Sequence, residues 1–257
     1  MRHMSVAEEP KQCVVITGSS GGIGSALVST FLSAGYDVIA IDRAGPPATD
    51  HPNLVYLNAD LQQIVGNSAY AQEFCKELEG LIKDRRLRAL VNNAAMQKLA
   101  PVEEICRADW ASTMEVNVSA PFFLLQMLLK QLEDASGCVV NIGSIHASLT
   151  KPGFTAYATS KAALRGLTQA TAVELGARIR VNLIEPAAIA TDMLKAGFQD
   201  NPEGFAALGA CHPVGRIGTP EEVARLVLQI VNGDLQFLNG SIIRLDGGIG
   251  ARLHDPA

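Results

Sequence analysis

The chain has 257 residues, enough for one large α/β domain or two small ones with a sizeable buried core. Hydrophobic residues make up 48% and charged residues 18%, a composition that excludes a disordered polyelectrolyte. The formal net charge of -5 argues against nucleic acid or an anionic membrane surface as a partner, and no apolar run approaches the roughly 20 residues of a membrane-spanning helix.

Cysteine and histidine usage indicates a metal-free protein of a reducing compartment. The five cysteines are odd in number, widely spaced and form no CxxC pair, which is typical of free thiols. The five histidines are also scattered and show no metal-ligand spacing. Residues 1–10 carry two glutamates and no apolar leader segment, so we expect a flexible N-terminus on a cytoplasmic protein.

Short apolar runs alternate along the chain with longer segments of helical period. Predicted strands occupy residues 13–18, 37–42, 54–59, 89–92, 138–143, 179–184 and 241–245. Predicted helices occupy residues 22–34, 69–83, 109–133, 156–176 and 220–231. This alternation predicts a seven-stranded parallel sheet with helices on both faces. Because it continues without a linker, we expect one doubly wound α/β domain over residues 11–257.

One stretch, residues 186–218, interrupts this alternation because it is rich in glycine and proline. Irregular segments of this length inside a compact domain often cover a functional site. The stretch therefore predicts a lid, although an incidental surface excursion is the alternative.

The first predicted strand runs directly into the sequence TGSSGGIG at residues 17–24, and a helix is predicted at once. Glycines let the backbone approach a pyrophosphate, and the free N–H groups of a helix start bind its negative charge. Strand, glycine loop and helix in this order predict a Rossmann-type dinucleotide site. The expected contact residues are Gly18, Ser20, Gly22, Ile23 and Gly24.

Asp42 ends the second predicted strand, at about the distance from the glycine loop that a ribose-binding acid requires. Its carboxylate can accept hydrogen bonds from the adenosine ribose and would repel the extra phosphate of NADP. The sequence therefore favours NAD(H) over NADP(H). Arg43 keeps NADP(H) open, because a neighbouring guanidinium can tolerate that phosphate.

Tyr157 and Lys161 are four residues apart in a predicted helix and so lie on one face of it. A free tyrosine has a pKa near 10, too high for an efficient base at neutral pH. A nearby ammonium and an oxidised nicotinamide, both cationic, should lower that pKa. The pair is therefore a candidate proton-transfer centre, against the alternative of a surface tyrosine beside a solvated lysine.

From residue 13 to residue 248 the chain resembles the short-chain dehydrogenase/reductase family, whose motifs it matches in order. Residues 17–24 resemble the TGxxxGIG loop, residues 60–61 the adenine-side aspartate, residues 92–95 the NNAG motif and residues 186–191 the PGxxxT segment. Residues 215–223 and 245–248 resemble the lead into the penultimate helix and the C-terminal signature. The resemblance implies that the cofactor is contacted by Asp60, Leu61, Asn93, Ala94, Tyr157, Lys161, Pro186, Ile189 and Thr191.

The family's catalytic tetrad falls on Asn117, Ser144, Tyr157 and Lys161. The resemblance implies that Tyr157 exchanges the proton, while a hydroxyl at Ser144 can stabilise charge on the substrate oxygen. It also implies that Asn117 holds a water that relays the proton from Lys161 toward solvent.

Two alanines depart from the family pattern: Ala95 ends NNAG and Ala187 follows Pro186, each in place of glycine. If either position needs a positive φ, alanine costs on the order of 1 kcal/mol, with consequences for cofactor affinity.

Three residues are candidates for the substrate pocket, namely Gln97, His146 and Phe154, with Lys151 in the loop nearby. Gln97 and His146 resemble the residues with which 3-hydroxybutyrate dehydrogenases hold a substrate carboxylate, but Phe154 stands where those enzymes carry a lysine. A small hydroxy or keto acid is the resulting candidate substrate. The alternative is that Gln97 and His146 are ordinary loop residues.

The predicted helix at residues 109–133 has too continuous an apolar run for one buried face, which indicates a second packing partner. In the family the equivalent helix pairs between subunits, so the resemblance implies a homotetramer.

The sequence thus predicts an oxidoreductase that transfers a hydride between NAD(H) and a secondary alcohol or ketone. An NADP-dependent 3-ketoacyl-type reductase and a non-catalytic dinucleotide-binding sensor are the alternatives.

Overall fold

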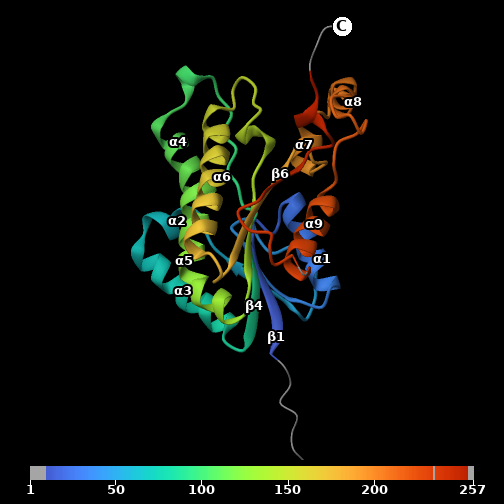
Figure 1. The fold of residues 1–257 in the computed structure, drawn as a ribbon. Helices are drawn as coiled ribbons and strands as arrows, with labels where there is room; N and C mark the ends of the chain where they lie inside the picture. Colours follow the sequence, from blue (N-terminus) through green and yellow to red (C-terminus); the bar gives the residue numbers. More distant parts are fainter. Residues whose placement is uncertain (1–9, 234, 254–257) are drawn as a thin grey trace, which may run out of the picture.

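The computed structural model describes residues 10–233 and 235–253, built around one sheet (Figure 1). Within these residues seven parallel strands pair in the order β3-β2-β1-β4-β5-β6-β7. The Rossmann-type α/β fold is therefore confirmed, whereas all of the predicted flexible N-terminus except Pro10 lies outside the described residues. The strands are β1 (Lys11–Thr17), β2 (Asp37–Asp42), β3 (Leu54–Asn58), β4 (Arg85–Asn92), β5 (Cys138–Ile142), β6 (Arg180–Pro186) and β7 (Ile242–Leu245).

Both faces of the sheet are covered, which explains the consecutive apolar residues of its strands. In β1, Cys13 and Val15 join one buried cluster while Val14 and Ile16 join the other. Figure 1 shows one helical layer on each side of the sheet. One layer holds α2 (Leu61–Gly66), α3 (Ser68–Ile82), α4 (Arg107–Met114), α5 (Ala120–Asp134) and α6 (Thr155–Leu175), and the other holds α1 (Gly22–Ser33) and α9 (Pro220–Asn232).

The helix predicted at residues 109–133 is not one regular α-helix. A π-helical turn, Glu115–Ser119, separates α4 from α5, and Asn117 lies inside it. Such single-turn π segments insert a residue into a helix and occur frequently at functional sites. Here the turn places the buried Asn117 amide against the residues after β4 and against α6.

The stretch between β6 and α9 contains two helices that the sequence did not predict, α7 (Asp192–Ala196) and α8 (Pro202–Ala210). Asn201 caps α8 by accepting the N–H of Gly204 at 2.8 Å, and Pro202 occupies its first turn. Ile189 pairs with Gly218 at the base of the stretch, so its two ends are held together. Both helices lie at the upper right of Figure 1, above α9 and α1.

In the described part of the chain, no helix combines the length and apolarity needed to cross a membrane. Across the same residues, no group of three or more potential ligand side chains gathers as a metal site.

Candidate active site

The glycine loop after β1 is so tightly packed that two of its positions accept only glycine. Gly18 has a φ of +64°, and a Cβ built there would lie 2.7 Å from the Cα of Ala94. A Cβ on Gly24 would lie 1.9 Å from the carbonyl oxygen of Gly18. The loop therefore turns directly against the first turn of α1 and presents backbone rather than side chains.

The start of α1 fits a bound pyrophosphate. Its N-cap, Gly21, offers no side-chain hydrogen bond, and its first turn has no acidic residue. By contrast, Asp60, Asn67 and Thr219 cap α2, α3 and α9 with side-chain oxygens. The first N–H groups of α1 have no intrahelical acceptors, so they are placed to bind a negatively charged group.

Asp42 lies at the end of β2 beside this loop. One carboxylate oxygen accepts the N–H of Ser20 at 3.0 Å, and the other accepts the N–H of Ala44 at 2.9 Å. These two bonds fix the carboxylate next to the glycine loop, where the predicted ribose contact requires it. Arg43 is exposed at the adjacent position.

The residues after β4 clamp the glycine loop through Thr17, a residue that the sequence analysis did not single out. The Thr17 hydroxyl accepts the N–H groups of Asn93 and Ala94, both at 3.1 Å. The Asn93 amide in turn donates to the carbonyls of Thr17, at 3.1 Å, and Gly18, at 2.9 Å. The position of Thr17 at the head of the glycine motif was the only sequence signal for this role.

Other predicted cofactor residues also reach this region. Asp60 accepts the N–H of Gln62 at 2.9 Å as the N-cap of α2, whose first residue, Leu61, is buried. A Cβ on Gly22 would come within 2.9 Å of the Thr191 methyl group, so the segment after β6 lies against the glycine loop. Pro186 and Ile189 are buried at the start of that segment.

The two alanines that depart from the family pattern carry no backbone strain. Among the described non-glycine residues, only Ser136 has a positive φ, so Ala95 and Ala187 adopt backbone conformations open to any residue. The N–H of Ala187 donates to the carbonyl of Leu245 at 3.2 Å, which ties the start of the segment to β7. The strain considered from the sequence is therefore absent.

Lys161 is almost completely buried, with only 2% of its surface exposed. Its ammonium donates to the carbonyl of Ile142 at 2.8 Å, and its Nζ lies 5.6 Å from the ring centre of Tyr157. Burial disfavours the charged form and lowers the pKa of Lys161 to about 8. The lysine thus lies next to the phenol ring, as the spacing on α6 predicts.

The Tyr157 phenol is partly exposed and lies beside Ser144, the residue that follows Gly143 after β5. Burial raises the pKa of Tyr157 above its ordinary value, and a hydrogen bond with Ser144 opposes that rise without cancelling it. The expectation that Lys161 lowers this pKa is therefore not met in the protein alone, because desolvation of the phenol is the larger effect.

The Asn117 side chain forms hydrogen bonds to protein groups through both its oxygen and its nitrogen. Its oxygen accepts the N–H of Met96 at 2.7 Å, and its nitrogen donates to the Met96 carbonyl and to the Ser160 hydroxyl, each at 2.9 Å. Ser160 in turn donates to the carbonyl of Tyr157 at 2.7 Å. Asn117 thus links the residues after β4 to the helical turn of Tyr157, and Ser160 is a second residue that sequence reasoning missed.

A stack of side chains borders Tyr157 on the loop before α6. The rings of His146 and Phe154 are parallel within 10°, with centres 4.3 Å apart, and the His146 ring meets the Tyr157 ring edge-on at 5.9 Å. The Lys151 ammonium lies 4.9 Å from the centre of Phe154. Burial lowers the pKa of His146, and the charge of Lys151 lowers it further.

Gln97 is exposed in the segment after β4. The N–H of Ala100 donates to the carbonyl of Gly153 at 3.1 Å, which brings that segment beside the loop of Lys151 and Phe154. The structure thus brings His146 and Phe154 to the candidate centre but places Gln97 only in the neighbouring segment.

Comparisons with known proteins agree with this geometry. The family model of the short chain dehydrogenases matches residues 12–202. The chain is 33% identical to protein FixR of Bradyrhizobium diazoefficiens, over 93% of this chain and 87% of that protein. It is 30% identical to the D-threitol dehydrogenase of Mycolicibacterium smegmatis, over 91% of each chain.

Solved structures with bound nucleotides are also similar. A 4-hydroxyisoleucine dehydrogenase mutant complexed with NADH and succinate shares 29% identity at a TM-score of 0.84, over 94% of this chain and 99% of that one. ElxO with NADP bound shares 25% identity at a TM-score of 0.82, over 94% of this chain and 100% of that one.

The chain therefore belongs to the short-chain dehydrogenase/reductase family. It is an oxidoreductase that acts on CH–OH donors with a nicotinamide dinucleotide.

Proposed function

We propose that the chain catalyses hydride transfer between NAD(H) and a secondary alcohol or ketone, with Tyr157 as the group that exchanges the proton. The observation that supports this most directly is the gathering of Tyr157, Ser144 and Lys161 beyond the carboxyl end of β5. Ligands of open α/β sheets bind at such strand ends. The experiment that tests the proposal is the replacement of Tyr157 argued in the Discussion.

Each residue has a role that follows from its contacts. The bound nicotinamide supplies the hydride acceptor or donor. Tyr157 takes the hydroxyl proton or returns it, and Ser144 stabilises charge that develops on the substrate oxygen. Lys161 keeps a positive charge beside the phenol, which favours phenoxide. Asn117 positions the Tyr157 turn through Ser160, and its side-chain oxygen keeps a second lone pair that can accept a hydrogen bond from a relaying water.

We infer a preference for NAD(H) from Asp42, whose carboxylate is fixed beside the glycine loop. Replacing Asp42→Asn preserves the shape and one acceptor oxygen but removes the negative charge. We expect the ratio of kcat/KM with NAD to kcat/KM with NADP to fall by roughly 5–150-fold, since a lost charge repulsion of this kind is worth on the order of 1–3 kcal/mol. Steady-state kinetics with both cofactors measures the ratio.

Asp50→Asn is the matched control for this change, because Asp50 lies in the loop between β2 and β3, outside the predicted cofactor contacts. It should leave the cofactor ratio unaltered. A wild-type enzyme that prefers NADP, or an Asp42→Asn enzyme with an unchanged ratio, would contradict the assignment. The NADP-bound structure of ElxO makes this measurement necessary.

For the substrate we propose a small hydroxy or keto acid. Phe154 stands where the resembling pocket carries a lysine, yet the ammonium of Lys151 lies against this same phenylalanine ring. No salt bridge neutralises Lys151 among the described residues, so its charge is available to a carboxylate. His146, stacked on Phe154 beside Tyr157, can donate a hydrogen bond to the same group. The succinate in the related 4-hydroxyisoleucine dehydrogenase complex is consistent with a carboxylate ligand.

Lys151→Met should raise KM for a hydroxy or keto acid about tenfold or more, because a charge-assisted contact is worth about 1.5–3 kcal/mol. The KM for the corresponding methyl ester should stay the same, since an ester carries no charge. Lys83→Met, at the exposed end of α3, serves as the control and should alter neither value. An equal response of acid and ester to Lys151→Met would refute the acid pocket while leaving the oxidoreductase activity itself in place.

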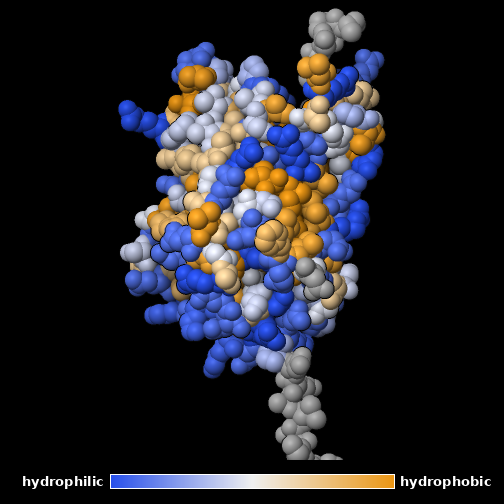
Figure 2. Space-filling view, in the orientation of Figure 1, coloured by the Kyte–Doolittle hydropathy of each residue, from blue (hydrophilic) through white to orange (hydrophobic). Residues whose placement is uncertain are grey.

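Several further proposals concern organisation. The predicted domain spans residues 11–257, of which 254–257 lie outside the described residues, and within it residues 186–218 act as a lid, supported by the contact of Thr191 with the glycine loop. The chain assembles as a homotetramer, supported by Phe122 and Trp110, each about 40% exposed on α5 and α4. Figure 2 shows a further apolar area near the centre of one face, around β6 in the view of Figure 1. The five free cysteines support a reducing, cytoplasmic location.

The two alternatives from the sequence have less support. A 3-ketoacyl-type reductase that uses NADP would have to bind the extra phosphate beside the Asp42 carboxylate. A non-catalytic sensor has no need of a lysine beside a tyrosine at a site whose burial lowers the pKa of Lys161 to about 8.

A further inference from the structure

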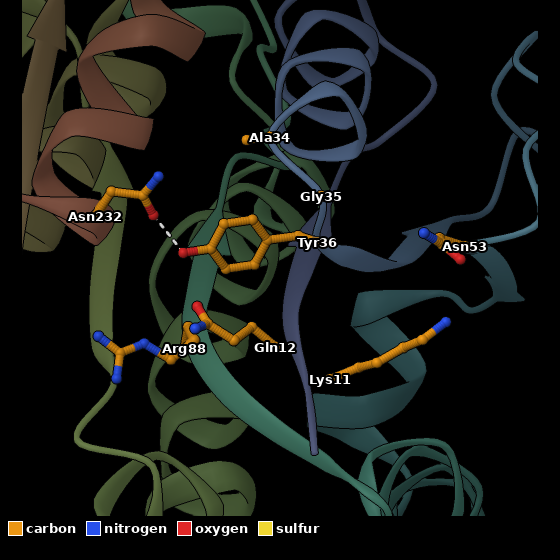
Figure 3. A pocket seen from close by; sticks show the side chains of 8 residues that line it. All are labelled: Lys11, Gln12, Ala34, Gly35, Tyr36, Asn53, Arg88 and Asn232. Atoms are coloured by element: carbon orange, nitrogen blue, oxygen red, sulfur yellow. Dashed lines mark hydrogen bonds between the residues drawn. The ribbon is translucent and has the colours of Figure 1, made fainter. Parts of the chain in front are cut away.

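A hollow of about 570 Å³ lies at the amino end of the sheet, opposite the candidate active site. It is lined at the start of β1, the turn after α1, the middle of β4 and the end of α9 (Figure 3). Since β1 is seven residues long, about 20 Å of sheet separates this hollow from the glycine loop. We call it the basic hollow, and the described residues that line it are Lys11, Gln12, Ala34, Gly35, Tyr36, Asn53, Arg88 and Asn232.

The lining is polar and cationic. It contains two cations and three amides, and none of its eight residues is acidic. Figure 3 shows the Gln12 amide and the Arg88 guanidinium on one side of the hollow, below the Tyr36 hydroxyl, while Lys11 extends the other way toward Asn53. The Tyr36 hydroxyl hydrogen-bonds to the side-chain oxygen of Asn232, which leaves the Asn232 amide nitrogen as a donor.

Arg88 is displaced from the regular strand pattern. In the pairing of β1 with β4, Cys13 faces Leu87 and Val14 faces Ala89, so the register slips by one residue at Arg88. A slip of this kind re-aims a side chain and is a common device next to functional sites. Here it accompanies a guanidinium that reaches the lining of the hollow.

Arg88 also has an unused donor. One terminal nitrogen donates to the carbonyl of Ala135 at 2.7 Å, but its Nε is buried and has no hydrogen-bond partner. A buried N–H without an acceptor costs about 1–3 kcal/mol, more when it belongs to a charged group. The other terminal nitrogen of Arg88 makes no hydrogen bond within the described residues and is not among the buried atoms, so it is the donor that an acceptor in the hollow can reach.

The surrounding charges do not already satisfy Arg88. Asp37 is the acid close to Lys11, at 3.9 Å, but it is held more closely by Arg85, at 2.6 Å. Arg180 adds another positive charge, because it and Arg88 both act on the Cys138 thiol. The helices α1 and α9 end at this side of the sheet, and their carbonyl ends attract cations. The hydrogen bond of Arg88 nevertheless goes to Ala135, in the turn between α5 and β5, rather than to either helix.

We propose that the basic hollow is a second binding site, which takes an oxyanion, the phosphate or carboxylate group of a small metabolite, on Arg88 and Gln12. Lys11 attracts the anion from the rim. The site is independent of the cofactor pocket and of the proposed catalytic chemistry, because it lies at the other end of the sheet.

The test is the thermal unfolding of the full chain saturated with NADH, so that the pyrophosphate site is filled. Inorganic phosphate in one series and citrate in another are compared with sodium chloride at equal ionic strength. The preferred anion should give a saturable rise of about 2–4 °C in Tm, and the two series distinguish phosphate from carboxylate recognition. Isothermal titration calorimetry of the same holoenzyme should show the matching heat of binding.

Variants assign the effect to the hollow. Arg88→Gln should abolish the anion-dependent rise, and Lys11→Gln should weaken it severalfold. Gln12→Glu places a carboxylate beside Arg88 and should also abolish the rise, which keeps the test decisive if Arg88→Gln does not fold. Arg86→Gln is the matched control, since Arg86 is an exposed cation on the same strand outside the lining.

Three results would overturn the proposal. One is the absence of any rise beyond that in sodium chloride, and another is a rise that survives in both Arg88→Gln and Gln12→Glu. The third is a loss of the rise in Arg86→Gln as large as in Arg88→Gln, which would show general screening of surface charge.

Discussion

Replacing Tyr157→Phe should lower kcat by about 10²–10⁴-fold, the usual contribution of a positioned acid or base. The substitution keeps the ring that contacts His146 and Phe154 but removes the hydroxyl beside Ser144. The proton then has to pass directly to or from water. The turnover of a substrate panel, followed by nicotinamide absorbance, measures the effect.

Two further measurements show that the loss is chemical. NADH affinity, measured by fluorescence titration, should stay within about threefold, because the glycine loop and Asp42 are untouched. The pH dependence of kcat/KM should lose the ionisation of the phenol, which a merely structural role would not remove. A Tyr157→Phe enzyme that turns over at the wild-type rate would exclude Tyr157 as the proton-exchanging group.

Most of the fold could be predicted because its signal is local. The strands carry consecutive apolar residues, as in β1, where Val14 and Val15 enter opposite cores. The alternation with helical segments then leaves few topologies, since parallel strands require right-handed crossovers. The glycine loop was equally readable, because a turn packed against Ala94 and against its own helix accepts no Cβ at Gly18 or Gly24.

The π-helical turn could not be predicted from the sequence. One added residue rotates the following helical face by about 100°, but the apolar run within residues 109–133 is too continuous to show that rotation. What favours the turn is a set of hydrogen bonds from Asn117 to Met96 and Ser160, residues 21 and 43 positions away. The helices α7 and α8 were missed for a different reason, because their short lengths and the glycines of α8 conceal the helical period.

The chemistry of the centre was predicted only in part. Spacing on a helix places Tyr157 beside Lys161, but the direction of a pKa shift depends on how much water the whole fold removes. Desolvation of the phenol exceeds every favourable contact, so its pKa rises in the protein alone. The unsatisfied donor of Arg88 could not be predicted either, because it accompanies a register slip between two strands that the local sequence does not reveal.

Because Lys161 is buried, its replacement should raise the stability of the protein and lower its activity. Lys161→Met is close in volume and removes the ammonium from a site that is only 2% exposed. Because burial holds the pKa of Lys161 at about 8, below its ordinary value of 10.5, the folded state disfavours the charged form at pH 7. The variant should therefore be more stable by about 1–2 kcal/mol, or roughly 2–6 °C in Tm, after the lost bond to Ile142 offsets about 1 kcal/mol.

The pH dependence follows from proton linkage. Between about pH 8 and pH 10.5 the unfolded chain binds a proton on Lys161 that the folded chain does not, so wild-type stability gains with rising pH relative to the variant. The advantage of Lys161→Met should be largest below pH 8 and should shrink through this window. Thermal unfolding from pH 7 to pH 10 measures the difference.

The same variant should lose about 10²-fold or more in kcat, because a positive charge no longer favours phenoxide at Tyr157. A more stable but much less active enzyme is the signature of a group retained for chemistry at the expense of the fold. A Lys161→Met enzyme that is less stable at pH 7 would show that the lysine mainly supports the structure through Ile142. One that keeps its turnover would show that the charge beside the phenol is not needed.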